Sequence, residues 1–225
     1  MNSVEVYIIV EGQTEQTFVR EVLAPVMTHK GIYLYPALIG KPGRKGGDIR
    51  FERAKEDIGN FLRQRPNIHI STMFDYYRLE ADWPGNIKTS GRHKAIEKAT
   101  RIEIATSARI KELFPEYNVD ERFTPYIEMH EFEALLFSNV SVLAGKLNVN
   151  PSDIKEILDE CGEPEEIDDG ANTSPSKRLV SIDNSYRKVA MGKTISEAIG
   201  IQTMRQKCPH FNNWISTLER LVVAE

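Results

Sequence analysis

The sequence predicts an α/β fold in which helices flank a mostly parallel sheet, followed by a C-terminal helical extension. The first observation is the order of the segments: apolar runs typical of strands alternate with segments whose apolar residues recur at helical spacing. The second is a change of character at Pro151, after which the pattern is helical. We therefore expect residues 1–140 to form an α/β domain and residues 141–225 to form an extension packed on it.

The strand segments are short and rich in β-branched and aromatic residues. Strands are expected at Val4–Val10, Ile32–Ile39, Ile68–Phe74 and Phe123–Met129. In the second of them, Tyr33 and Tyr35 share one face and Leu34 occupies the other, as the two-residue period of a strand requires. The first and third strands each lead directly into an acidic residue.

The helices are indicated by apolar residues three or four positions apart and by capping residues at their starts. Thr14 can cap the first helix, and Asp48 can cap a second one that runs to Leu62. Further helices are expected at about His93–Leu113, His130–Phe137, Pro151–Cys161, Ser176–Val189, Thr194–Ile199 and Phe211–Val223. The polar segment Tyr76–Arg92 and the acidic segment Gly162–Thr173 are expected to be loops.

The composition of the 225 residues is that of an ordinary globular protein, with a formal net charge of −4. No apolar stretch approaches the roughly 20 residues of a membrane helix, and the chain enters a strand at once, so we expect a cytoplasmic protein without a signal peptide. The two cysteines, Cys161 and Cys208, have no zinc or redox spacing. The net charge does not indicate nucleic-acid binding, but a carboxylate-rich metal site also makes a chain acidic.

Acidic residues follow three of the expected strands. Glu11 and Glu15 follow the first, Asp75 follows the third, and the run Glu128–Glu133 ends the fourth. Because the carboxyl ends of parallel strands lie at one edge of the sheet, we expect these acids to converge there. Carboxylates held that close repel one another unless a cation lies between them, and oxygen ligands suit Mg²⁺ or Mn²⁺. Scattered surface acids are the alternative, since the chain has 33 Asp and Glu residues.

Two of these segments carry a resemblance to a known fold. Val-Glu-Gly-Gln-Thr-Glu at residues 10–15 and Met-Phe-Asp-Tyr-Tyr-Arg-Leu at residues 73–79 resemble the Toprim fold of topoisomerases, primases and overcoming-lysogenization-defect nucleases. The whole chain resembles a Toprim-related family of bacterial proteins often encoded beside ATPases of the AAA or ABC type. The further motifs of that resemblance are Asp82-Trp83-Pro84-Gly85, Glu131-Phe132-Glu133-Ala134-Leu135-Leu136, Ser176-Lys177-Arg178-Leu179 and Cys208-Pro209-His210-Phe211 with Trp214.

The resemblance implies a Toprim-like α/β domain and a site for Mg²⁺ or Mn²⁺. It puts Glu11 at the position of the family's acid–base glutamate and Asp75 at the first metal-binding aspartate, but Tyr77 stands where a second aspartate is expected. It further implies Glu131 and Glu133 as ligands. These two acids and Glu15, which lies at the junction after the first strand, would support Glu11 and Asp75. Asp82 and Glu128 are the other available acids; Glu128 and Glu131 share a face of a helix, whereas Glu131 and Glu133 share one only in extended backbone.

Cationic residues that could contact a phosphate occur in two segments. One is the glycine-rich segment Gly40–Gly47 with its three cations; the other holds Lys177 and Arg178, followed by Tyr186, Arg187 and Lys188. We select Lys177 and Arg178 as catalytic candidates for a scissile phosphate, with capping and surface roles as the alternative. His130 could serve in acid–base chemistry or simply pack. The segment Ala190–Thr194 resembles the end of a P-loop but lacks its first glycine and preceding strand.

These features favour a divalent-metal-dependent phosphodiester hydrolase that acts on DNA or RNA, and the resemblance implies a role in defence against foreign DNA. Glu11 would serve as ligand or general base and Asp75 as the principal ligand, with one or two metal ions. The alternative is a non-catalytic partner or sensor subunit of an ATPase complex with a degenerate metal site, which the missing second aspartate favours. Hydrolysis of a small phosphorylated ligand is a third hypothesis, and a homodimer is left open.

Overall fold

The computed structural model describes residues 3–40, 49–87, 93–168, 170 and 172–222. Its centre is a five-stranded sheet in the order β2-β1-β3-β4, with β5 pairing with β3 beyond the end of β4. The strands are β1 (Val4–Val10), β2 (Ile32–Leu38), β3 (His69–Asp75), β4 (Phe123–Thr124) and β5 (Ile127–Glu128). Every pairing among them is parallel, which confirms the α/β prediction.

Helices connect the strands and cover the sheet. In the first half they are α1 (Gln13–Phe18), a π-helical turn at Val19–Leu23, α2 (Ala24–Thr28), α3 (Phe51–Gln64), α4 (Ala95–Leu113) and α5 (Val119–Arg122). Short 3₁₀ segments occur at Tyr76–Arg78, Pro115–Tyr117, Phe132–Ser138 and Pro164–Glu166. The later helices are α6 (Val140–Leu147), α7 (Pro151–Cys161), α8 (Pro175–Ile182), α9 (Lys188–Ile199), α10 (Ile201–Lys207) and α11 (Pro209–Arg220).

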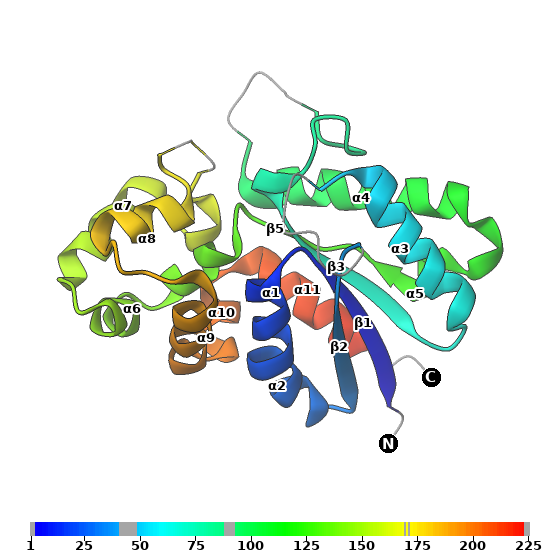
Figure 1. The fold of residues 1–225 in the computed structure, drawn as a ribbon, viewed down its shortest axis with the longest axis horizontal. Coiled ribbons are helices and arrows are strands. Elements are labelled where there is room, and N and C mark those ends of the chain that lie inside the picture. Colours follow the sequence, from blue (N-terminus) through cyan, green and yellow to red (C-terminus); the bar gives the residue numbers. More distant parts are fainter. Residues whose placement is uncertain (1–2, 41–48, 88–92, 169, 171, 223–225) are drawn as a thin grey trace.

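The inner strand β1 is buried on both faces, because its successive side chains enter different apolar clusters, whereas the edge strand β2 leaves Tyr33 and Tyr35 exposed on one face. Ile8 and Val10 pack in one cluster, while Ile9 packs in the other. Figure 1 shows the corresponding layers: α1, α2 and α11 lie on one side of the sheet and α3 and α4 on the other. None of the helices among the described residues has both the length and the apolar character needed to cross a membrane.

The helices after residue 140 share a core with the sheet. The cluster that contains Val6 and Phe18 also contains Leu143, Ile195 and Trp214, all of them buried. Figure 1 shows α6, α7 and α8 grouped beside the sheet, with α9 and α10 next to α1 and α2. Burial of apolar surface therefore joins the helical part to the α/β part.

Several element boundaries differ from the sequence predictions. The expected strand Phe123–Met129 is broken into β4 and β5, since Pro125 between them has no N–H for the ladder. The helix expected at Ser176–Val189 is wrong: α8 ends at Ile182, and a new helix, α9, begins at Lys188. The reason is a turn in which Asp183 Oδ1 accepts hydrogen bonds from the backbone N–H of Ser185 at 2.8 Å and from its hydroxyl at 2.7 Å.

The caps also differ from expectation at two helix starts. The first helix begins at Gln13 with Gly12 as its N-cap, so Thr14 lies inside the helix and is not the cap. α3 begins at Phe51 with Arg50 as its N-cap. The expected cap Asp48 and the basic residues of the segment Gly40–Gly47 lie outside the described residues.

Candidate functional site

The carboxyl ends of β1 and β3 carry the first acids of the site. The two strands are neighbours in the sheet, and Val10 of β1 pairs with Met73 of β3. Glu11 therefore leaves its strand beside Asp75, the last residue of β3. In an open parallel sheet, this edge is where ligands bind.

Backbone N–H groups hold three of the predicted acids in place. Glu15, in the first turn of α1, accepts a hydrogen bond from the N–H of Gly12 through Oε2 at 2.9 Å. Asp75 Oδ1 accepts from the N–H of Phe132 at 2.9 Å, which ties the end of β3 to the segment that follows β5. Glu131 Oε2 accepts from the N–H of Ser176 at 2.9 Å, in the first turn of α8, where a helix favours negative charge.

Glu131 and Glu133 meet at a lysine. The Lys188 ammonium Nζ lies 3.2 Å from Glu133 Oε1 and 3.3 Å from Glu133 Oε2. It also lies 3.9 Å from Glu131 Oε1. The backbone of Glu131 is extended, with φ −143° and ψ 155°, so the 3₁₀ segment starts only after it and both acids reach the same cation.

The acids interact electrostatically as one cluster. Burial, followed by the charges of Glu15, Glu11, Glu133 and Glu131, raises the pKa of Asp75 well above its usual range. Burial and then Glu15 raise the pKa of Glu11 to about 7, although Arg78, whose Nε is 3.6 Å from Glu11 Oε1, opposes this shift. Like charges in a low dielectric favour protonation in this way. The pKa of each carboxyl therefore depends on its neighbours, as expected of acids brought to one place.

The lysine offsets only part of the negative charge. Burial raises the pKa of Glu133 to about 7 and also raises that of Glu15, while Lys188 lowers both. Burial by itself lowers the pKa of Lys188, but the negative charges of Glu133 and Glu131 have the larger effect, so that its pKa is raised. The five acids Glu11, Glu15, Asp75, Glu131 and Glu133 thus surround a site in which additional positive charge would be stabilised.

The other predicted residues have different surroundings. Lys177 is exposed, and the guanidinium of Arg178 donates to the carbonyl of Thr173 at 2.9 Å and pairs with Glu160 at 3.1 Å. The contacts of Arg178 are thus with the end of α7 and the acidic loop. Tyr77, at the position of the second aspartate, is 44% exposed and donates its backbone N–H to the carbonyl of His130 at 3.1 Å.

Lys188 is the functional candidate that the sequence did not select. The sequence placed it near the end of one long helix that also held Lys177 and Arg178. The turn after Asp183 instead makes Lys188 the first residue of α9. The hydroxyl of Tyr186 also faces the cluster: burial, followed by Glu133 and Glu131, raises its pKa. The Asp183-Asn184-Ser185 sequence was the available signal for this turn.

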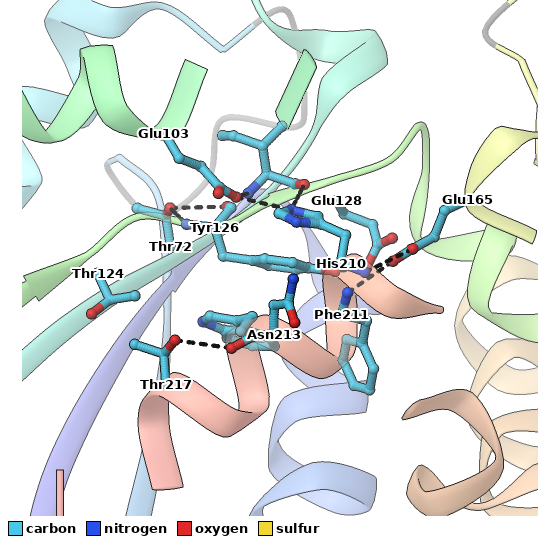
Figure 2. A network of polar contacts seen from close by, with 12 residues as sticks. Thr72, Glu103, Thr124, Tyr126, Glu128, Glu165, His210, Phe211, Asn213 and Thr217 are labelled. Atoms are coloured by element: carbon cyan, nitrogen blue, oxygen red, sulfur yellow. Dashed lines mark hydrogen bonds and ion pairs between the residues drawn. The ribbon is translucent and has the colours of Figure 1, made fainter. Parts of the chain in front are cut away.

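Glu128 belongs to a different network, which Figure 2 shows between the sheet and α11. Its Oε2 accepts a hydrogen bond from the hydroxyl of Tyr126 at 2.8 Å. The Tyr126 ring stacks on Trp214, with centroids 4.2 Å apart, and on His210, at 5.0 Å. Burial and then the charge of Glu165 raise the pKa of Glu128 well above its usual range. Glu128 therefore serves to join α11 to β5 rather than to extend the acidic cluster.

The same network accounts for the histidine and cysteine of the Cys208-Pro209-His210 segment. His210 Nε2 lies 2.9 Å from Glu103 Oε1, and Glu165 accepts hydrogen bonds from the N–H groups of His210 and Phe211 at 2.9 and 2.8 Å (Figure 2). Cys208 Sγ is buried 3.3 Å from the hydroxyl of Ser138. These contacts give both side chains a role in attaching α11.

The acidic cluster has the donor chemistry for a hard divalent cation but not a finished coordination geometry. Its donors are carboxylate oxygens, and Glu11 Oε2 is buried without a hydrogen-bond partner among the described residues. In the described part of the chain, however, no group of three or more His, Cys, Asp or Glu side chains is arranged to hold a metal ion. Glu11, Glu15 and Asp75 could hold such an ion if their side chains drew together around it.

Comparisons with known proteins place the chain in a family. No curated protein and no solved structure matches it. The model of a family described as a domain of unknown function, DUF4276, matches residues 10–219. That match includes β3 with Asp75, the segment with Glu131 and Glu133, and Lys188 of α9. Because it spans most of the sequence, the chain belongs to the DUF4276 family.

Proposed function

We propose that this protein is a Toprim-like phosphodiester hydrolase that depends on Mg²⁺ or Mn²⁺ and acts on nucleic acid in the cytoplasm. One observation carries the proposal: acids from three strand ends lie near one another at the carboxyl edge of a parallel sheet, where their charges raise the pKa of Asp75, and two of them pair with Lys188. The motifs at residues 10–15 and 73–79, which resemble those of overcoming-lysogenization-defect nucleases, support the same chemistry.

The roles of the residues follow from their positions. Glu11, Glu15 and Asp75 would hold the ion, which when bound polarises a phosphate and lowers the pKa of a coordinated water. Alternatively, Glu11 would be the general base instead of a ligand, because its pKa of about 7 in the absence of a bound ion allows it to gain and lose a proton near neutral pH. Arg78, 3.6 Å from Glu11 and 43% exposed, is placed to bind a phosphate oxygen from the open side of the site.

The proposal extends to partners. A nuclease of this kind, encoded beside an AAA or ABC ATPase, would act in defence against foreign DNA together with that ATPase. A homodimer would supply two such sites to the two strands of a duplex. Co-purification of the chain with the ATPase encoded beside its gene tests the first of these, and sedimentation of the chain alone tests the second.

A nuclease assay with matched variants tests the activity. Single-stranded and duplex DNA and RNA are incubated with the protein in Mg²⁺ or Mn²⁺, and with Glu11→Gln, Asp75→Asn and the control Glu156→Gln. Glu156 is exposed on α7, away from the strand ends. We expect cleavage by wild type and the control and at least a hundredfold loss in the two site variants. Equal cleavage by all four proteins, or by none of them, contradicts the proposal.

A second candidate is a non-catalytic partner or sensor subunit of an ATPase complex. Two observations favour it: Lys188 already neutralises part of the acidic cluster, and the position of the second aspartate is an exposed tyrosine. This candidate predicts no cleavage and no binding of Mn²⁺ at millimolar concentration by calorimetry. Binding of Mn²⁺ together with cleavage that depends on Glu11 would exclude it.

A further inference from the structure

Lys188 occupies one side of the acidic cluster in the way a bound cation would. Its ammonium is nearly equidistant from the two oxygens of Glu133, at 3.2 and 3.3 Å, and so lies across the open face of that carboxylate. Mg²⁺ needs oxygen ligands at about 2.0–2.1 Å. An ion that used both oxygens of Glu133 would overlap the position of the ammonium, so the lysine and such an ion exclude each other.

The neighbouring carboxylate of Glu131 also faces Lys188, while Glu133 Oε1 has the ammonium at 3.2 Å but no hydrogen-bond partner among the described residues. Glu131 Oε2 accepts the hydrogen bond from Ser176, and Glu131 Oε1 faces the same ammonium at 3.9 Å. On the other side, Glu11 Oε2 is buried and has no hydrogen-bond partner among the described residues. Glu11 Oε1 in turn lies 3.6 Å from Nε of Arg78, whose side chain is 43% exposed. The buried Glu131 and Glu133 thus pair with Lys188, whereas Glu11 pairs with a partly exposed arginine.

Close packing of α9 at Gly192 holds Lys188 near Glu133. Gly192 follows it by one helical turn, so the two residues share a face of α9. A Cβ at Gly192 would lie 3.2 Å from the ring of Phe132 and 3.6 Å from the methyl of Thr14. The missing side chain lets α9 approach α1 and the Phe132 segment closely. This approach carries the start of α9 to Glu133, the residue next to Phe132.

We propose that Lys188 is a built-in counter-cation that limits the site to one divalent ion, held by Glu11, Glu15 and Asp75. The inference rests on one part of the proposed function, namely that the site binds a divalent ion; it does not require that the protein cleaves nucleic acid. It goes beyond that function by assigning the lysine a role and the site a stoichiometry. It also explains how the site tolerates Tyr77 in place of a second aspartate, because a second ion has no place to bind.

Counting bound Mn²⁺ tests the inference. Calorimetry and the loss of the free-ion paramagnetic resonance signal are measured for wild type, Lys188→Met and Lys193→Met. Lys193 is a matched control, since it lies on the same helix but pairs with Glu21 and Glu197. We expect one ion per chain in wild type and in the control, and two in Lys188→Met. Two ions or none in wild type, or a single ion in Lys188→Met, would overturn the inference.

A second measurement needs no variant and so does not depend on how Lys188→Met folds. Acetylation of lysines by acetic anhydride is followed by mass spectrometry, with and without saturating Mn²⁺. The Lys188 side chain is 46% exposed, so its reactivity without metal, lowered by its ion pair with Glu133, is the reference. Because the ion is expected on the other side of the cluster, this reactivity should not change. If Mn²⁺ raises the reactivity of Lys188 while that of the exposed Lys177 stays the same, the ion has displaced the ammonium and the inference fails.

The two proposals fail separately. One bound ion without any cleavage contradicts the proposed hydrolase but leaves the role of Lys188 intact. Cleavage with two bound ions contradicts the role of Lys188 but leaves the hydrolase intact.

Discussion

The pH dependence of stability at Glu11 is the sharpest consequence of the acidic cluster. The side chain is 13% exposed, and burial followed by the charge of Glu15 raises its pKa from the ordinary 4.5 to about 7. The unfolded chain releases this proton near pH 4.5, whereas the folded protein keeps it until about pH 7. Between these values the folded state binds more protons, so the free energy of unfolding falls as the pH rises.

The size of the effect follows from the shift. The difference between 7 and 4.5 is about 2.5 pKa units, and each unit corresponds to about 1.36 kcal/mol. Glu11 therefore costs at most about 3 kcal/mol of stability above pH 7, in the absence of a bound ion. Glu11→Gln removes the charge and keeps the shape, so the variant should gain up to that amount at pH 8 and little at pH 4.5. For a chain of this length the gain corresponds to roughly 6–12 °C in melting temperature.

Thermal unfolding in EDTA at pH 4.5, 6 and 8 measures this difference. Burial lowers the pKa of His69 to about 4, which also changes stability in this range, but wild type and variant share that change and it cancels. Glu156→Gln, on the exposed face of α7, should differ from wild type by the same amount at each pH. A Glu11→Gln advantage that stays constant from pH 4.5 to 8 would refute the coupling of Glu11 to the cluster.

Three further substitutions test contacts elsewhere in the fold, each by urea denaturation. Glu165→Gln should lower the free energy of unfolding by about 1–3 kcal/mol, because the carboxylate accepts hydrogen bonds from two N–H groups at the start of α11 at 2.8–2.9 Å. The control Glu163→Gln, at an exposed neighbour, should change it little. Equal effects of the two substitutions would contradict the capping role of Glu165. Gly59→Ala should lower the free energy of unfolding by about 1–3 kcal/mol, since the new Cβ would lie 2.4 Å from the Phe114 ring. A higher free energy of unfolding would show that the ring moves aside to make room for it. Gly145→Ala, in open space on α6, should instead stabilise by about 0.5–1 kcal/mol, and a loss would contradict that openness.

The strands of the fold were predictable because local signals and tertiary structure agree there. The run Val4–Val10 is apolar except for the exposed Glu5, as expected of a strand that helices cover on both faces, and the structure has the same bounds for β1. The same agreement gives α7 its predicted bounds, Pro151–Cys161, with Asn150 as its cap. Where the signals compete, as at Pro125 in an otherwise strand-like segment, the prediction failed because one missing N–H outweighs the apolar pattern.

Which acids meet at the site depended on backbone geometry that periodicity does not determine. Spacing alone left Glu128 with Glu131 in a helix, or Glu131 with Glu133 in an extended segment. The N–H of Phe132 donates to Asp75, and this bond anchors the segment just before the 3₁₀ turn while Glu131 is still extended. Glu131 and Glu133 then meet Lys188, and Glu128 instead bonds to Tyr126. The hydrogen bond between Phe132 and Asp75, which are far apart in the sequence, therefore determines which acids meet.

The helical part after residue 140 completes the site as well as the core. It supplies the N–H of Ser176 that holds Glu131 and the ammonium that faces Glu133. Without these two groups, both buried carboxylates would lose partners that stabilise their charge, and burying an unpaired charge is costly. The strand ends can therefore bring their acids together only because helices distant in sequence return to them, and the fold and the acidic cluster depend on the same contacts.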